Sequence, residues 1–215
     1  EYSRRSLQIY QEIQRENDLS IRQNGSIYIA SDAEEQQLLH ELKASFDDRN
    51  YACHLLSKQQ CLDKWPVLEP SYVKEALFFP EELSVDPIRM IHQLVAYMKA
   101  KYEKLTYLSD TPVCRLEQDA NQVTLFSSRG ETYHGNKVLL CSGAEFSLLY
   151  PELFSESSLE VSKLQMLRTV AMPSVKLTGN ILTGLTIRRY ESFTECPSFS
   201  KLSEPEHYAE LKHWG

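Results

Sequence analysis

The sequence predicts an α+β fold, with an antiparallel sheet and flanking helices plus a small β-meander with a helix of its own. Two patterns support this class. Long segments carry apolar residues three and four positions apart, as amphipathic helices do, and the strand-like segments are short and separated by turns. Strands joined by short turns pair antiparallel, because a parallel pair needs a long crossover. The 215 residues suffice for one large domain or two small ones.

The first part of the chain predicts two helices and a strand. Residues 2–17 place apolar side chains among charges at helical spacing. Asn24 and Gly25 mark a turn into a strand over residues 26–30. Asp32 is suited to cap the next helix. The apolar stripe of that helix consists of Leu38, Leu39, Leu42 and Phe46.

Two further helix starts carry capping signals. Ser57 and Gln60 have the spacing of a capping box, which opens a short helix that Pro66 must end. Asp86 can accept hydrogen bonds from free backbone amides, and Pro87 at the first helical position loses no needed donor. The apolar face of this last helix consists of Ile88, Ile91, Leu94, Val95, Met98 and Tyr102.

Short strands are predicted over most of the remaining chain. The candidates are residues 76–79, 105–108, 113–116, 123–127, 131–133, 137–141, 165–171, 175–177 and 185–190. Gly130 and Gly135 lie in predicted turns. Residues 137–141 are apolar without alternation, as in a strand covered on both faces. A final helix is predicted over residues 204–214.

Composition and charge exclude several classes of protein. Hydrophobic residues make up 42% of the chain and charged residues 25%, which is typical of a globular protein. The net charge of −7 repels phosphate backbones and anionic membranes, so no nucleic-acid partner is expected. No apolar run approaches the roughly 18 to 20 residues that cross a bilayer, so no membrane span is expected. The oligomeric state stays open.

Cysteine and histidine usage indicates a compartment and argues against a metal site. The five cysteines are odd in number and widely spaced, whereas secreted disulfide scaffolds are denser and usually even. We therefore predict a reducing, cytoplasmic location. The six histidines form no ligand spacing such as H-x-x-x-H, so no metal is expected. Cys141 lies on a predicted buried strand and is expected to be a small core residue rather than a nucleophile.

A candidate ligand site follows the apolar strand 137–141, where the chain continues as Ser142-Gly143-Ala144. A ligand that lies flat against a main chain needs a residue without a side chain, because a Cβ would hold it off. Gly143 meets that need. The alternative is that Gly143 merely ends a strand, as many glycines do.

Three short motifs occur in a fixed order around this site. Val85-Asp86-Pro87 opens the last long helix, Thr111-Pro112-Val113 begins the meander, and residues 140–144 end it. In this order the chain resembles the FAD-dependent oxidoreductases of the D-amino-acid oxidase and glycine oxidase family. The resemblance extends from about the strand at Ser26 to the neighbourhood of His207.

The resemblance implies a set of backbone contacts to FAD. Adenine would lie against the backbone of Val113. The ribose and pyrophosphate would lie beside Ser142, Gly143 and Ala144. A flavin enzyme of this kind needs no strong acid or base from the protein, so the resemblance implies no particular catalytic side chain.

The chain departs from the family pattern in two places. It lacks the G-x-G-x-x-G motif that holds pyrophosphate and the glycine-rich C-terminal segment that meets the flavin ring. We therefore expect an internal fragment that binds flavin weakly or not at all and is inactive alone. The resemblance implies a first part of the substrate-binding domain over residues 1–84, part of the FAD-binding domain over residues 85–150, and the rest of the substrate-binding domain over residues 151–215.

The segment 186–190 is the main candidate for contact with substrate. The resemblance implies an arginine that binds the substrate carboxylate and tyrosines that line the cavity. Alternation along a strand would put Arg188 and Tyr190 on one face, with the alternative that the arginine only meets solvent. Arg168 is a further cavity candidate, with a core strand as the alternative.

Residues 179–184 have the glycine spacing of a phosphate-binding loop but lack its lysine, so they predict a turn between strands. The functional hypothesis is the central part of an FAD-dependent oxidoreductase that acts on a small amine, an amino acid or an aminophosphonate. The alternative is a non-catalytic module that recognises a protein or a small acidic ligand.

Overall fold

The computed structural model describes residues 2–160 and 163–203. The chain forms two compact units, one made of residues 1–100 with 170–215 and the other of residues 101–169. The first unit is therefore assembled from two separate chain segments. The functional division predicted at residues 84 and 150 stays a prediction.

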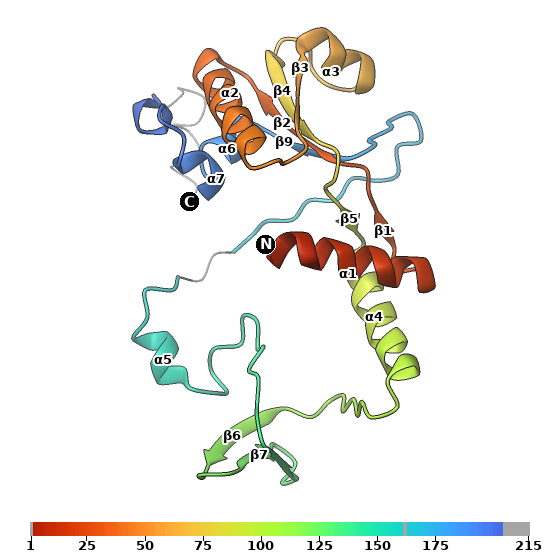
Figure 1. Ribbon diagram of the computed structural model, residues 1–215, viewed down its shortest axis with the longest axis vertical. Coiled ribbons are helices and arrows are strands. Elements are labelled where there is room, and N and C mark those ends of the chain that lie inside the picture. The colour runs from red at the N-terminus through yellow and green to blue at the C-terminus, as the bar shows by residue number, and fades with distance from the viewer. Residues whose placement is uncertain (1, 161–162, 204–215) are drawn as a thin grey trace. The chain divides into compact units, whose positions relative to one another are not determined.

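The first unit contains a four-stranded sheet, in the order β3-β4-β2-β9 (Figure 1). Its strands are β2 (Ser26–Ala30), β3 (His54–Ser57), β4 (Glu75–Phe79) and β9 (Asn180–Leu182). The β2–β4 and β3–β4 pairs are antiparallel, and β9 pairs parallel with β2. The predicted α+β class is confirmed, and the sheet is mixed rather than purely antiparallel.

Helices cover both faces of this sheet. Side chains of α2 (Ala33–Asp48) share one core cluster with Tyr28, and α3 (Lys58–Lys64) contributes to a second cluster with Ile27 and Ile29. Successive side chains of a strand point to opposite faces, so β2 supplies both clusters and all five of its residues are buried.

The predicted helix caps are confirmed. Asp32 accepts a hydrogen bond from the backbone nitrogen of Glu35. Ser57 and Gln60 form the capping box of α3. Asp86 accepts from the backbone nitrogen of Arg89, 3.2 Å away, at the start of α4 (Pro87–Lys101).

The first unit also contains α1 (Tyr2–Glu16) and a short ribbon in which β1 (Ile21–Arg22) pairs antiparallel with β5 (Ser84–Val85). The predicted helices at residues 2–17 and 87–102 are thus confirmed. Helix α4 has no buried residue, and Ile88 is 73% exposed.

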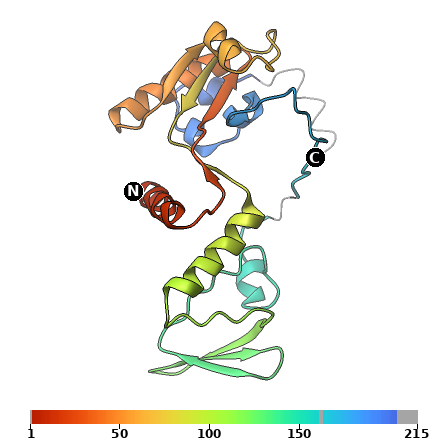
Figure 2. The same cartoon turned by 90° about the vertical axis from the view of Figure 1, so that its right-hand side faces the viewer.

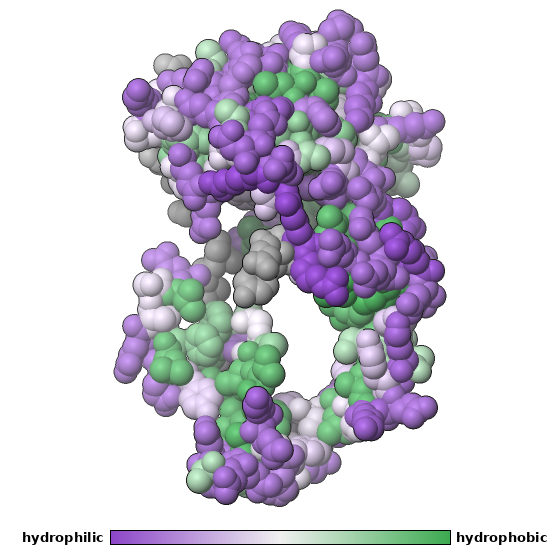
Figure 3. Space-filling view, viewed as in Figure 1, coloured by the Kyte–Doolittle hydropathy of each residue, from purple (hydrophilic) through white to green (hydrophobic). Residues whose placement is uncertain are grey.

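The second unit is built on a three-stranded antiparallel sheet, drawn in green in Figure 2. It consists of β6 (Val113–Gln118), β7 (Val123–Ser127) and β8 (Thr132–Gly135), and a short helix α5 (Pro151–Ser155) follows. Three of the four strands predicted for the meander are confirmed. Apolar side chains of this unit are exposed on the face shown in Figure 3.

Several predicted strands are wrong. Residues 105–108, 137–141, 165–171 and 175–177 have no strand assignment. Cys141 is accordingly exposed rather than buried. Apolar composition alone does not make a strand, because a strand needs a neighbour that satisfies its backbone groups, and among the described residues these segments have none.

The region after residue 178 differs most from the prediction. The expected turn over residues 179–184 contains β9, and the expected strand over residues 185–190 is a helical turn, α6 (Gly184–Ile187). Helix α7 (Glu191–Thr194) and a 3₁₀ turn (Phe199–Lys201) follow. The predicted helix over residues 204–214 lies outside the described residues. Among the described residues, no helix is long and apolar enough to cross a membrane.

Candidate functional site

A cavity in the second unit brings together two segments that the sequence marked as ligand-binding. Its volume is about 380 Å³. Val113 at the start of β6 and Ser142 in the predicted turn both line it. The other lining residues are Leu125, Val138, Leu139, Leu140, Cys141, Glu145, Leu148 and Leu149. The cavity walls are therefore mainly apolar.

The turn at residues 142–145 leaves its backbone open. Glu145 donates its backbone N–H to the carbonyl oxygen of Ser142, 3.1 Å away. Gly143 has φ of +63°, a left-handed conformation that side chains rarely adopt. A Cβ at Gly143 would lie more than 4 Å from every atom outside its chain neighbours. The backbone conformation thus favours glycine, and the space beside it is free among the described residues. Ala144 is exposed next to it.

Glu145 is a lining residue that the sequence analysis missed. Its Oε1 accepts hydrogen bonds from the backbone nitrogens of Ser147, at 2.7 Å, and Leu148, at 3.2 Å, and from the Ser147 hydroxyl. The Ser147 hydroxyl and the two backbone amides outweigh desolvation and lower the pKa of Glu145. The signal was present in the sequence, because an acid two residues before a serine often forms such a local turn.

The chemistry of this cavity favours one kind of ligand group. Among the described residues neither arginine nor lysine lines it, so these residues offer no cation to a phosphate. Its apolar walls suit a flat ring, and the fixed carboxylate of Glu145 can accept hydrogen bonds from an amine or a hydroxyl. Among residues 2–160 and 163–203, no group of three or more His, Cys, Asp or Glu residues could hold a metal ion.

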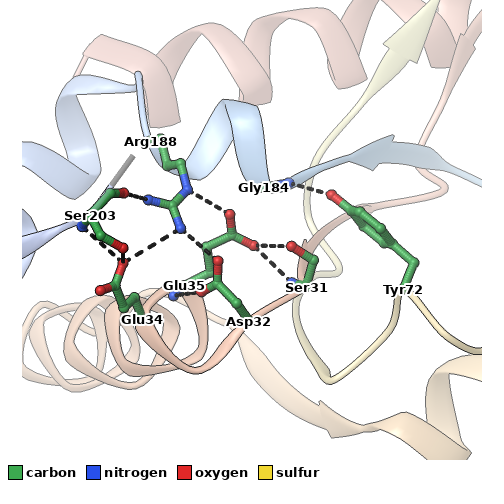
Figure 4. A network of polar contacts seen from close by, with 8 residues as sticks. All are labelled: Ser31, Asp32, Glu34, Glu35, Tyr72, Gly184, Arg188 and Ser203. Carbon is green, nitrogen blue, oxygen red and sulfur yellow. Dashed lines mark hydrogen bonds and ion pairs between the residues drawn. The ribbon is translucent and has the colours of Figure 1, made fainter. Parts of the chain in front are cut away.

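Arg188 lies in a network of acidic side chains in the first unit (Figure 4). Its Nε donates to Glu35 Oε1 at 2.7 Å, and its Nη2 donates to Asp32 Oδ2 at 2.6 Å. Nη1 donates to the carbonyl oxygen of Ser203 at 2.8 Å, and Glu34 Oε2 is 3.7 Å from Nη2. The Arg188 side chain is 9% exposed and that of Glu35 is fully buried.

The contacts of Arg188 favour a structural role. Burial acts to lower its pKa, but the hydrogen bonds and charges of Glu35 and Asp32 outweigh burial and raise it. Gly184 approaches the same carboxylate so closely that a Cβ there would lie 2.3 Å from Glu35 Oε1. Arg188 thus holds α6 against the start of α2, and a substrate carboxylate would have to displace Glu35 or Asp32.

The other predicted substrate residues are more accessible. Because residues 186–190 form a helical turn, the predicted sharing of one strand face by Arg188 and Tyr190 is wrong. Tyr190 is 49% exposed, and its ring centroid lies 6.4 Å from that of Tyr28. Arg168 is exposed in a segment without secondary structure and belongs to the other unit.

The family comparison matches most of the chain. Residues 1–191 match the model of the DAO family, described as FAD dependent oxidoreductase. No curated protein matches the chain.

Solved structures show the same fold in part. Glycine oxidase from Geobacillus kaustophilus is similar with a TM-score of 0.54 and 22% identity, over 62% of this chain and 36% of that one. L-proline dehydrogenase from P. horikoshii gives 0.53 and 19%, over 59% and 34%. Glycine oxidase from Bacillus cereus gives 0.55 and 17%, over 63% and 38%. The chain thus spans little more than a third of the length of these proteins.

Proposed function

This chain belongs to the family of FAD-dependent oxidoreductases, and from that premise we propose that its protein oxidises an amine or an amino acid, with an aminophosphonate as a further candidate. The similar structures support the substrate class, since two are glycine oxidases and one is an L-proline dehydrogenase. The reducing, cytoplasmic location is part of the same proposal, and the five free cysteines support it.

One observation carries the proposal for this chain, namely the shared cavity of Val113 and Ser142. We assign this cavity to the adenosine end of FAD. The apolar walls suit the adenine ring, the open turn at Gly143 and Ala144 allows close approach to the backbone, and Glu145 can accept hydrogen bonds from an amine or a hydroxyl. Within the described part of the chain no lysine or arginine lines the cavity, which argues against assigning the pyrophosphate here.

FAD, when bound, supplies the acceptor for the hydride that leaves the substrate carbon. The residues of this chain contribute binding and position. The backbone at Val113 and at residues 142–144 would hold the cofactor, and the apolar walls would contact its adenine ring. No catalytic side chain is assigned. Tyr190 and Arg168 stay candidates for contact with substrate, and the geometry favours them over Arg188.

The test compares two glycine variants of the full-length gene product in a titration of the apoprotein with FAD, which is followed by quenching of flavin fluorescence. Gly143→Val places a branched side chain beside the cavity, and we expect its FAD affinity to fall at least about tenfold. Gly130→Val is the matched control. Gly130 also has a positive φ, +81°, and a Cβ added there would meet open space. It lies in the β7–β8 turn, however, and is not among the residues that line the cavity.

If the two variants bind FAD with equal affinity, the assignment of the adenosine end of FAD to this cavity is wrong. The oxidase function has a separate test in the full-length gene product. If that product is purified colourless and takes up no flavin on reconstitution, the oxidoreductase proposal is wrong and the binding-module alternative replaces it.

A further inference from the structure

A larger cavity, independent of the proposed flavin site, lies in the first unit. Its volume is about 520 Å³, within the range of roughly 300–1,000 Å³ that small-molecule sites occupy. Residues of α1, the end of α2 and the turn after β4 line it.

Four of the eleven described residues that line the cavity are aromatic. The Phe46 ring lies 5.2 Å from that of Tyr51 and 5.6 Å from that of Phe79, measured between centroids. Leu7 and Tyr10 face the same space from α1. No side chain of residues 4–16 is buried, so α1 covers the cavity instead of filling it.

The cationic side chain of Arg4 attaches the N-terminal end of α1 to the segment that follows α2. Arg4 Nη2 donates to the carbonyl oxygen of Asn50 at 2.7 Å, and the Arg4 guanidinium lies 4.1 Å from the ring centroid of Tyr51. The aromatic wall therefore already accepts a positive charge on one of its faces.

Among the described residues, two arginines and two glutamates line this cavity, and they differ in their contacts. The two lining arginines are engaged, Arg4 as described and Arg49 with Glu195, 3.4 Å away. Glu82 accepts a hydrogen bond from Ser26. In the described part of the chain, no residue donates a hydrogen bond or forms an ion pair with Glu81. Glu81 also lines an adjoining polar cavity of about 340 Å³ and is exposed, so its carboxylate stands where the apolar space opens.

We propose that this cavity binds an organic amine, with its apolar body against Phe46, Phe79 and Leu7 and its ammonium group at Glu81. An ammonium between an aromatic wall and a carboxylate gains from both, through a cation–π contact and an ion pair. The proposal concerns reversible binding and holds whether or not the chain binds flavin.

The experiment compares 2-phenylethylamine with 2-phenylethanol, a neutral molecule of nearly the same shape, in NMR titrations of the 215-residue chain. The amine is expected to bind about tenfold more tightly. Glu81→Gln should abolish this preference. Glu191→Gln, which alters an exposed glutamate of α7 outside the cavity, should leave it unchanged.

A second variant tests the location. Leu7→Trp should fill the cavity and weaken amine binding at least about tenfold, with circular dichroism as the check on folding. If that variant does not fold, Glu81→Gln decides alone. Three results would overturn the proposal: no saturable amine binding, equal binding of the alcohol, or a preference for the amine that survives Glu81→Gln.

Discussion

Arg188 is the residue for which the structure differs most from the role predicted from the sequence. The family resemblance implied that Arg188, two residues before Tyr190, binds a substrate carboxylate. It does bind carboxylates, but those of Glu35 and Asp32 in the same chain. Sequence spacing could not show this, because 153 positions separate Arg188 from Glu35. The chemistry of an arginine follows from its type, whereas its partner depends on the tertiary fold.

Replacing Arg188 should therefore affect stability. Arg188→Met leaves the fully buried Glu35 carboxylate without its cation, and removing one partner of a buried pair costs about 3–5 kcal/mol. We expect the free energy of unfolding to fall by that amount in urea denaturation. The control is Arg189→Met at the adjacent exposed position, where the change should stay within about 0.5 kcal/mol. Equal effects of the two variants would contradict the structural role.

The buried thiols give a prediction about pH. Burial raises the pKa of Cys61 and Cys196 from 9.0 to about 11. Below about pH 9 both thiols are protonated in the folded and unfolded chain, and their contribution to stability is fully present. Between pH 9 and 11 the unfolded chain loses these protons while the folded chain keeps them, so the free energy of unfolding should fall.

Urea denaturation across this pH range measures the effect, and Cys196→Ala should make the decline shallower. Cys114→Ala alters an exposed thiol and should leave the decline unchanged. The same burial predicts that Cys114 and Cys141 react with a thiol reagent in the folded chain before the three buried cysteines do.

For helices and strands, the sequence predicted those features that depend on contacts between residues close together in the chain. Helix starts were predictable because a cap bonds within three residues of itself, as Asp32 does with Glu35. Strand β9 was not predictable, because its three residues pair with β2, more than 150 positions earlier in the chain. The segment 185–190 alternates like a strand, but Gly184 and Arg188 hold it against Glu35 as a helical turn.

The candidate flavin site was predictable in part for the same reason. The turn at Gly143 follows from local sequence, and its positive φ favours glycine. Its association with Val113 came from resemblance to a family, and the shared cavity agrees with that pairing. The spacing of Glu145 and Ser147 predicts only a local turn, and nothing in the spacing of the cavity leucines distinguishes a cavity wall from a core.

The capping box of α3 gives a prediction at this scale. Ser57→Ala removes the hydroxyl that accepts from the backbone nitrogen of Gln60, and we expect a loss of about 1 kcal/mol in the free energy of unfolding. Ser57→Asp keeps an acceptor at the same position and should restore most of the loss. If the aspartate variant is as unstable as the alanine variant, the cap does not stabilise this helix.

For the whole molecule, the two units differ in how the chain builds them. The unit of residues 101–169 is continuous, and its three strands follow one another with short turns. The other unit needs its second segment, because β9 pairs with β2 and because Ile187 and Phe193 lie fully buried in the core beside Tyr28, Leu38 and Leu39. Stability of the two units should therefore respond differently to loss of the C-terminal segment.

Truncation of the chain after Thr169 tests this difference. The truncated chain lacks the buried side chains of Ile187 and Phe193, each of which contributes about 1.5–3 kcal/mol to the free energy of unfolding. It also leaves Glu35 without Arg188, which costs about 3–5 kcal/mol more. Because domains are stable by only about 5–15 kcal/mol, we expect hydrogen exchange to show loss of protection in β2 and β4. Protection in β6 and β7 should persist, since all partners of these strands lie before residue 136. Unchanged protection in β2 would mean that residues 26–79 form a stable core by themselves and that the Arg188 network is dispensable for folding.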